Sequence, residues 1–433
     1  MSNDAIAVLG FVVLFGLMAL RVPVGIALGI VGVGGFGLIV GMDSALNLLA
    51  LSPIRTVTTY DFALIPMFIL MGAFATASGM SRELFRAGNA WLGGQRGGLA
   101  LATISACAGF AAISGSSVAT SATMTQIALP EMERRGYSGR VAAGVIAAGG
   151  TLGILIPPSV VLAVYGFLTE QDVGRLFIAG VVPGVLAVLL QLATVKLIGW
   201  LRPGLLPQGV PSPWAERWRS LSRIWAVLLV FVLVIGGIYG GVVTATEAAA
   251  LGAVAVLAIG LARLRLSGGS IVRALVESLR TSVSIFVVLI GALLFGYFLT
   301  ITQVPQNIAD WLAGLALGPH AVLWLILLFY LVLGCLLDAM AMIILTIPII
   351  FPVVQQLGFD PIWFGVIVTL TVELGLITPP MGMNVFVINS VAPNVSLVEI
   401  FRGVAPFVLT LIVLVVLLVL FPGLATWLPG LMR

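Results

Sequence analysis

LGILIPP, at residues 152–158, recurs 222 residues later as LGLITPP, at residues 374–380. The same offset relates Pro130 to Pro352, and an offset of 224 relates Gly72 to Gly296. A double proline removes two backbone N–H donors and clashes with the preceding turn, so a helix that contains it unwinds. Because the similarity extends along the chain, we interpret the sequence as an internal duplication in which each half contains one broken helix.

The composition places most of this chain in membrane lipid. Of its 433 residues, 61% are apolar and only 8% are charged, whereas a soluble domain carries about 25% charged residues. At about 20 residues per spanning helix, the length allows roughly ten to twelve membrane segments. Of the 20 basic residues, 19 are arginines, and these lie in short runs between apolar segments. Such runs are typical of loops that set membrane topology and not of a nucleic-acid-binding surface. Cys107 and Cys335 lie in apolar runs, so no disulfide framework is expected.

The apolar segments pair across the two halves in the same order. Segments near 5–20, 24–41, 61–80, 141–169 and 176–200 correspond to segments near 225–242, 246–262, 281–303, 362–390 and 403–427. Each half therefore has about five crossings. Because five is odd, the second half is predicted to be inserted upside down relative to the first.

The arginine positions agree with this inverted arrangement. Basic residues concentrate in the predicted cytoplasmic segments 82–96, 131–140, 202–223 and 263–280. The segments that then lie outside hold only Arg55 and Arg175, and they are 43–60, 170–175, 243–245, 304–320 and 355–361. We therefore predict an all-α protein of two inverted repeats in the bacterial inner membrane, with both termini in the periplasm.

Two further apolar segments, 99–129 and 321–353, are interrupted near the middle. The first break is ISGSS at residues 113–117, and the second is GCLLDA at residues 334–339. Each arm has about 15 residues, which at 1.5 Å per residue is too short for a full crossing. We therefore expect two re-entrant hairpins whose tips end near the membrane centre, the first entering from the cytoplasm and the second from outside. The alternative is a long helix with a kink at each break.

The breaks in each half would bring unpaired polar groups to the middle of the membrane, where secondary transporters build their binding sites. Carbonyl and hydroxyl oxygens there suit a dehydrated sodium ion, and helix starts at the hairpin tips suit a substrate carboxylate. The carbonyl groups expected to lose their partners belong to Gly149, Gly150, Gly153, Ile156, Gly375, Ile377 and Thr378, and the nearby polar side chains are Ser114, Ser116, Ser117, Thr378 and Asn384. The alternative for each double proline is a kink that serves packing alone.

Three acidic residues fall inside apolar segments, where a carboxylate is costly and marks a candidate functional site. Asp338 lies at the second hairpin tip, and Glu373 lies just before LGLITPP. Either side chain could bind a cation or pair with another group. Glu247 follows Thr244-Ala245-Thr246, so a helix-capping role is equally compatible with its position.

These motifs resemble the large membrane subunit of TRAP transporters, the tripartite ATP-independent periplasmic family. The resemblance rests on AISGSSVAT at 112–120, GTLGILIPPS at 150–159, IPMF at 65–68 with Gly72, and TPPMGMN at 378–384, and it covers essentially the whole chain. Met381 departs from the family pattern, in which a smaller Val is common. The resemblance implies an elevator-type, sodium-driven importer of small organic acids such as C4-dicarboxylates, keto acids and sialic acids. It also implies two partners, a small four-helix membrane subunit and a periplasmic substrate-binding protein.

The resemblance further implies where the ligands bind, in Ser114–Ser117 with Gly150–Pro157 and in Gly334–Asp338 with Gly375–Asn384. From these regions we assign sodium ions, as the coupling cofactor, to Ser114, Gly115, Ser117, Gly150, Gly153, Ile156, Gly334, Leu337, Gly375, Thr378 and Met383. We assign the substrate to Ser116, Ser117, Pro158, Ser159, Asp338, Pro380 and Asn384. No organic cofactor is expected.

The repeats also predict which parts of the chain form a scaffold and which form a transport domain. Residues 1–58 are expected to be scaffold helices, and residues 201–280 a cytoplasmic linker with further scaffold helices. The two halves of a transport domain are expected at 59–200, with hairpin 99–129 and broken helix 141–169, and at 281–402, with hairpin 321–353 and broken helix 362–390. Residues 403–433 are expected to form a C-terminal helix. The sequence contains no catalytic motif and no ATP-binding loop, although a stand-alone sodium–anion symporter, a passive channel and a membrane enzyme remain alternatives.

Overall fold

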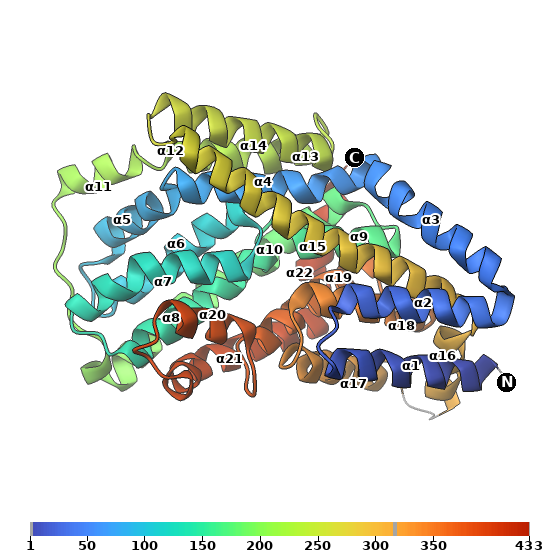
Figure 1. Ribbon diagram of the computed structural model, residues 1–433. Coiled ribbons are helices and arrows are strands. Elements are labelled where there is room, and N and C mark those ends of the chain that lie inside the picture. The colour runs from blue at the N-terminus through green and yellow to red at the C-terminus, as the bar shows by residue number, and fades with distance from the viewer. Residues whose placement is uncertain (1–2, 315–317, 433) are drawn as a thin grey trace.

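A computed structural model describes residues 3–314 and 318–432, and these residues form helices joined by short turns, with no strand among them. The helices form one elongated bundle (Figure 1). The double-proline helices lie in its interior, because almost the whole span Gly139–Thr169 is covered by protein. Helices nearer the outside expose large apolar side chains such as Leu228, Val254 and Leu279, as expected for surfaces that face lipid.

The first half of the chain contains eleven helical elements. They are α1 (Asn3–Ala19), α2 (Val24–Val40), α3 (Met42–Thr58), η1 (Tyr60–Ala63), α4 (Leu64–Ala77), α5 (Met80–Leu92), α6 (Gly98–Ser114), α7 (Ser117–Arg134), α8 (Gly139–Leu155), α9 (Val160–Thr169) and α10 (Val173–Leu201). Two short elements, η2 (Pro203–Leu205) and α11 (Trp214–Leu221), then lead into the second half.

The second half repeats this order of elements. It contains α12 (Trp225–Phe231), η3 (Val232–Gly236), α13 (Gly237–Tyr239), α14 (Ala245–Ala262), α15 (Gly268–Ile301), α16 (Val304–Gly314), α17 (Pro319–Gly334), α18 (Ala339–Gln356), α19 (Pro361–Leu376), α20 (Met383–Val391) and α21 (Leu397–Leu420), followed by α22 (Gly423–Thr426) and η4 (Pro429–Leu431). From α5 and α16 onward, each helix has a counterpart that begins 221 to 224 residues later. The predicted duplication is therefore confirmed at the level of the fold.

Both interrupted apolar segments fold back on themselves as hairpins. In the first, α6 ends at Gly115, whose positive φ of 61° turns the chain. Thr103, near the start of α6, contacts the sulfur of Met132, near the end of α7, which requires antiparallel arms. In the second hairpin, Thr346 of α18 hydrogen-bonds to Tyr330 of α17 at 2.7 Å. The hairpins approach the middle of the bundle from opposite ends (Figure 1), so the kinked-helix alternative is wrong.

The structure corrects two segments that we expected to be loops. Segment 43–60 is mostly helix α3, and segment 263–280 is mostly the beginning of α15, which runs for 34 residues without interruption. Segment 43–60 was placed between crossings by the topology, and segment 263–280 by its arginines. Arg55, Arg273 and Arg280 lie within helices and do not break them, whereas Arg263 and Arg265 lie in the turn before α15. Part of the expected outer segment 304–320 is α16, and residues 315–317 lie outside the described residues.

Among the described residues, eight helices are long and apolar enough to cross a membrane. Two of these eight belong to the interrupted segments: Ala339–Gln356 is an arm of the second hairpin, and Gly139–Thr169 spans both pieces of the first broken helix. The other apolar arms, Gly98–Ser114 and Pro319–Gly334, are shorter than a full crossing requires. The predicted orientation of the termini and the division into a moving and a static part stay predictions.

Candidate functional site

The first hairpin tip packs directly against the first double-proline break. A Cβ atom added to Gly153 would lie 2.5 Å from the carbonyl oxygen of Ser116, and one added to Gly115 would lie 2.9 Å from that of Pro158. Ser116 caps α7 by accepting a hydrogen bond from Ala119 N at 3.3 Å. The missing side chains at Gly115 and Gly153 are therefore what allow two irregular stretches of backbone to touch.

The break releases fewer carbonyl groups than we expected from the sequence. Helix α8 continues to Leu155, so the carbonyl groups of Gly149 and Gly150 lie inside a regular helix, and the expectation that they are freed is wrong. A proline deprives only the carbonyl four residues earlier of its partner, which here means Gly153 and Ile154. Gly150 instead provides space for the hydroxyl of Ser121. The carbonyl group of Ile156, in the break itself, has no backbone partner among the described residues.

The second hairpin tip meets the second break in the same way. A Cβ atom added to Gly375 would lie 2.5 Å from the Cα atom of Gly334, and Met381 N donates to the carbonyl oxygen of Cys335 at 3.2 Å. The Thr378 hydroxyl donates to the carbonyl oxygen of Leu374 at 2.6 Å. In the described part of the chain, the carbonyl groups of Ile377 and Thr378 have no backbone partner. The carbonyl group of Gly375, in contrast, accepts a hydrogen bond from Thr378 N.

Corresponding residues cap the inner arms of the two hairpins. Ser116 caps α7, and 222 residues later Asp338 caps α18 by accepting hydrogen bonds from Met340 N at 3.0 Å and Ala341 N at 3.1 Å. At the tips, a hydrogen bond joins the two halves: the Ser117 hydroxyl donates to Oδ1 of Asn384 on α20 at 3.3 Å. The structure therefore brings the two predicted regions together into one site.

A cavity of about 1250 Å³ separates the hairpin tips from helices α4 and α15. Of the residues assigned to substrate, Ser116, Ser117 and Asp338 line it, as do Ser114, Gly115 and Met383 from the sodium assignment. Pro158, Ser159 and Asn384 are buried behind the tips, and Pro380 does not line the cavity. These four cannot touch a molecule in the cavity in the arrangement that the structure shows.

The sequence analysis missed the opposite wall of this cavity. Helix α15 presents Ser270, Arg273, Glu277 and Thr281 to it. These residues are three or four positions apart, which places them on one helix face. The same spacing is visible in the sequence, but we interpreted Arg273 as part of a cytoplasmic loop.

The three intramembrane acids have different surroundings. Glu247 forms a capping box with Thr244, in which Thr244 N donates to its carboxylate at 2.8 Å, so the helix-capping position is confirmed. The Asp338 carboxylate caps α18 and also faces the cavity. Glu373 is fully buried close to Ser117, and neither of its carboxylate oxygens has a hydrogen-bond partner among the described residues. A buried carboxylate in this state requires a proton or a cation to offset its charge.

The donor groups at the site are mainly neutral oxygens. In the part of the chain that the structure describes, no three His, Cys, Asp or Glu side chains converge as they do in zinc or calcium sites. Carbonyl and hydroxyl oxygens at broken helices are instead the ligands that transporters use for sodium.

Comparison of the chain with known proteins finds one family and relatives that belong to the same kind of transporter. Residues 11–424 match the family described as the tripartite ATP-independent periplasmic transporter, DctM component. The chain is 39% identical to the C4-dicarboxylate TRAP transporter large permease protein DctM of Pseudomonas aeruginosa, over 90% of this chain and 93% of that protein. It is 30% identical to the sialic acid TRAP transporter large permease protein SiaM of Vibrio cholerae, over 96% of each chain.

A solved structure shares the fold. The YdaH transporter of Alcanivorax borkumensis, described as having an unusual topology, aligns with a TM-score of 0.63 over 90% of each chain. The sequence identity is only 15%, so this similarity concerns the architecture and not the transported molecule.

Proposed function

Because this chain belongs to the DctM family of tripartite ATP-independent periplasmic (TRAP) transporters, we propose that it imports a small organic acid together with sodium ions. The observation that carries the proposal is the pair of hairpin tips that meet at one cavity, each beside a double-proline break. Inverted repeats with broken helices at mid-membrane are how secondary transporters hold substrate and coupling ions.

Sodium would be held at the two contacts between a hairpin tip and a broken helix. At the first, Gly153 of α8 packs against Ser116 and Ser117 of the tip, and Ile156 follows in the break itself. The carbonyl groups of Gly153 and Ile156 would supply backbone oxygens, and Ser114 and Ser117 hydroxyl oxygens. The Ser114 hydroxyl lies 2.9 Å from that of Thr120, so side-chain oxygens gather on the inner side of the turn.

At the second contact, the available oxygens come from Thr378 and from the backbone around Gly375, with the tip residues Gly334 and Leu337 opposite and Met383 beyond the break. Removing the water shell of a cation costs free energy, and carbonyl and hydroxyl oxygens offset this cost because they replace the water ligands.

The cavity chemistry favours an anionic substrate with hydroxyl groups. Arg273 supplies a positive charge from α15, and the start of α7 at Ser117 directs backbone N–H groups toward the cavity. The Ser116 and Ser117 hydroxyls can donate to a carboxylate, whereas the Asp338 carboxylate can accept from a substrate hydroxyl. The relatives named for C4-dicarboxylate and sialic acid fit this class of molecule.

We also propose the partners and the location that a tripartite system requires. A periplasmic binding protein would deliver the substrate, and a small membrane subunit would cover part of the exposed apolar surface of α3, α12 or α15. The chain would lie in the inner membrane with both termini in the periplasm, as the arginine positions predict.

Uptake by proteoliposomes that contain the chain, the small subunit and the binding protein tests this proposal. Labelled C4-dicarboxylate, keto acid and sialic acid should each be offered with and without an inward sodium gradient. We expect accumulation of at least one substrate only with sodium and only with the binding protein. Sodium-driven uptake without the binding protein would indicate a stand-alone symporter, flux that never exceeds equilibrium would indicate a channel, and conversion of the substrate in detergent would indicate an enzyme.

A further inference from the structure

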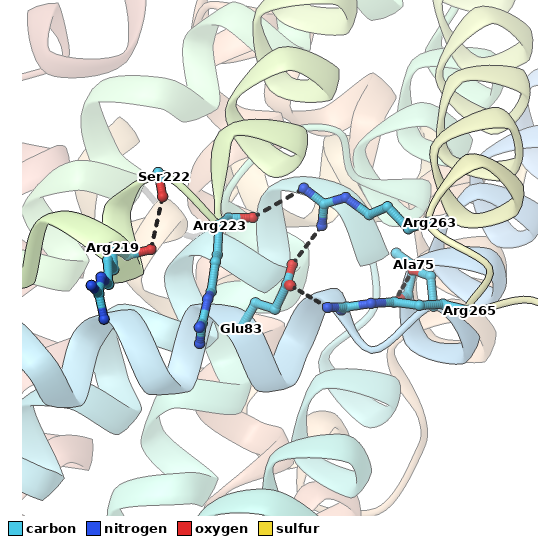
Figure 2. Close-up of polar contacts among 8 residues, drawn as sticks. Ala75, Glu83, Arg219, Ser222, Arg223, Arg263 and Arg265 are labelled. Carbon is cyan, nitrogen blue, oxygen red and sulfur yellow. Dashed lines mark hydrogen bonds and ion pairs between the residues drawn. The ribbon is translucent and has the colours of Figure 1, made fainter. Parts of the chain in front are cut away.

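A second cavity is rich in arginine and is formed by residues outside the hairpin tips. It has a volume of about 320 Å³ and is lined by Glu83 and Arg86 of α5, Ser220 of α11, Arg223, and Arg265 of the turn before α15. We call it the Arg86–Arg223 cavity. Figure 2 shows that Arg223 and Arg265 extend over α5 on either side of Glu83.

Glu83 anchors the floor of this cavity. Its side chain is only 6% exposed, and its carboxylate accepts from Arg263 at 2.9 Å and from Arg265 at 2.8 Å. Arg263 also donates to the carbonyl oxygen of Arg223 at 3.3 Å (Figure 2). Its guanidinium group lies over the ring of Trp225. The negative charge of Glu83 therefore already joins α5 to the turn that holds Arg263 and Arg265, and Arg263 in turn joins that turn to Arg223.

The cavity keeps a large excess of positive charge. Four arginines (Arg86, Arg223, Arg263 and Arg265) surround the single carboxylate of Glu83, which leaves a net charge of +3. Among the described residues, neither Arg86 nor Arg223 pairs with an acidic side chain. Two guanidinium groups beside a cavity of this size are suited to bind one phosphate group through paired N–H···O contacts.

Aromatic residues indicate the depth of the cavity in the membrane. Trp214, Trp218 and Trp225 are 65%, 61% and 47% exposed, and Trp91 packs edge-to-face against the first two. Exposed tryptophans concentrate at the level of the lipid headgroups. Beyond Trp225, Leu228 and Leu229 of α12 and Val232 at the start of η3 are exposed and form an apolar surface that suits an acyl chain.

We propose that the Arg86–Arg223 cavity binds the phosphate headgroup of an anionic phospholipid, such as phosphatidylglycerol, from the leaflet that the arginine positions identify as cytoplasmic. The phosphate contacts Arg86 and Arg223, and an acyl chain lies against α12. Basic pockets between membrane helices on the cytoplasmic side recognise anionic headgroups by this chemistry. The bound lipid joins α5 to the turn before α12, independently of which substrate the protein transports.

Lipid binding to the purified chain, delipidated and studied by native mass spectrometry, tests the proposal. Each arginine near an anionic headgroup contributes about fivefold in affinity, so two arginines predict a preference for phosphatidylglycerol over phosphatidylcholine of roughly 25-fold. The double variant Arg86→Gln/Arg223→Gln is expected to abolish this preference. It leaves the contacts of Glu83 with Arg263 and Arg265 in place, so an unchanged Tm in phosphatidylcholine verifies its fold.

The matched control is Arg134→Gln/Arg135→Gln, which removes the same charge from exposed arginines on the same predicted side and should keep the preference. A preference that survives in the Arg86/Arg223 variant would overturn the proposal, as would its absence in the unmodified chain. Inorganic phosphate or glycerol phosphate that binds as tightly as the lipid would assign the cavity to a soluble ligand. A preference that disappears when the small membrane subunit is co-purified would show that a protein covers the cavity, and would equally refute a lipid site.

Discussion

Replacement of Gly153 by alanine should separate the first hairpin tip from the broken helix. The added Cβ atom would lie 2.5 Å from the carbonyl oxygen of Ser116 and 2.8 Å from the Cα atom of Ser117. Both contacts are to backbone, so neither can be relieved by rotation of a side chain. Such overpacking typically costs about 1–3 kcal/mol. The tip can avoid the cost only by moving away, which would withdraw its oxygens from the proposed sodium site.

The resulting loss of sodium affinity can be estimated. If the strain applies only when tip and break are in contact, about 1–3 kcal/mol corresponds to an increase of roughly 5–150-fold in the apparent Kd for sodium. The assay is the sodium dependence of Tm in detergent, because a ligand that binds only the folded state stabilises it in proportion to the logarithm of its concentration. Uptake by proteoliposomes at several sodium concentrations should show the same shift.

The matched control is Gly34→Ala in α2, where an added Cβ atom meets nothing within 4 Å. It should leave the sodium response unchanged, and Tm should be unchanged or slightly higher because alanine favours a helix over glycine. A Gly153→Ala protein that is folded and retains the sodium affinity of the unmodified chain would refute the reasoning. Gly375→Ala provides an independent repeat of the experiment in the second half, since its Cβ atom would lie 2.5 Å from Gly334.

Three further substitutions test other parts of the site. Thr378→Ala removes a hydroxyl oxygen from the second proposed ion site and should weaken the sodium response about tenfold, the effect of roughly 1.4 kcal/mol, whereas Thr378→Ser should restore it. Arg273→Gln should raise the KM for an anionic substrate about fivefold, since a charge pair in a solvent-accessible site contributes about 1 kcal/mol. The control Arg280→Gln, on the same helix but outside the cavity, should leave the KM unchanged. Glu373→Met should raise Tm in sodium-free buffer, because it replaces an unpartnered buried polar group, which costs about 1–3 kcal/mol, with an apolar side chain of similar size. A lower Tm for that variant would show that the carboxylate already has a stabilising partner.

The features that the sequence predicted correctly have strong local causes. Pro157 and Pro379 cannot continue a helix, so both broken helices could be placed without knowledge of any tertiary contact. The small residues around Gly115 marked the first hairpin tip in the same way. The duplication then transferred each assignment to the other half.

The features that the sequence did not predict depend on contacts or on helix faces. Arg273 was assigned to a loop because arginine is typical of cytoplasmic loops, yet in α15 it faces a cavity whose other wall is 60 or more residues away in the chain. The pairing of Glu83 with Arg263 joins residues separated by 180 positions, and no local pattern reveals it. The burial of Asn384 and Ser159 behind the tips likewise depends on how the two halves pack.

The unequal construction of the two copies has a mechanical consequence. Helix α15 is a single rod of 34 residues, about 51 Å at 1.5 Å per residue, and it crosses the bundle diagonally (Figure 1). Its counterpart in the first half is jointed, because η1 at Tyr60–Ala63 separates α3 from α4. The segment in the second half is therefore one continuous helix, whereas the equivalent segment in the first half is two helices joined by a short connection. If the hairpins move against their surroundings, as the sequence predicts, we expect the bending to be concentrated at residues 59–63. Helix α15 would then pivot as a unit and carry Arg273 and Glu277 with it.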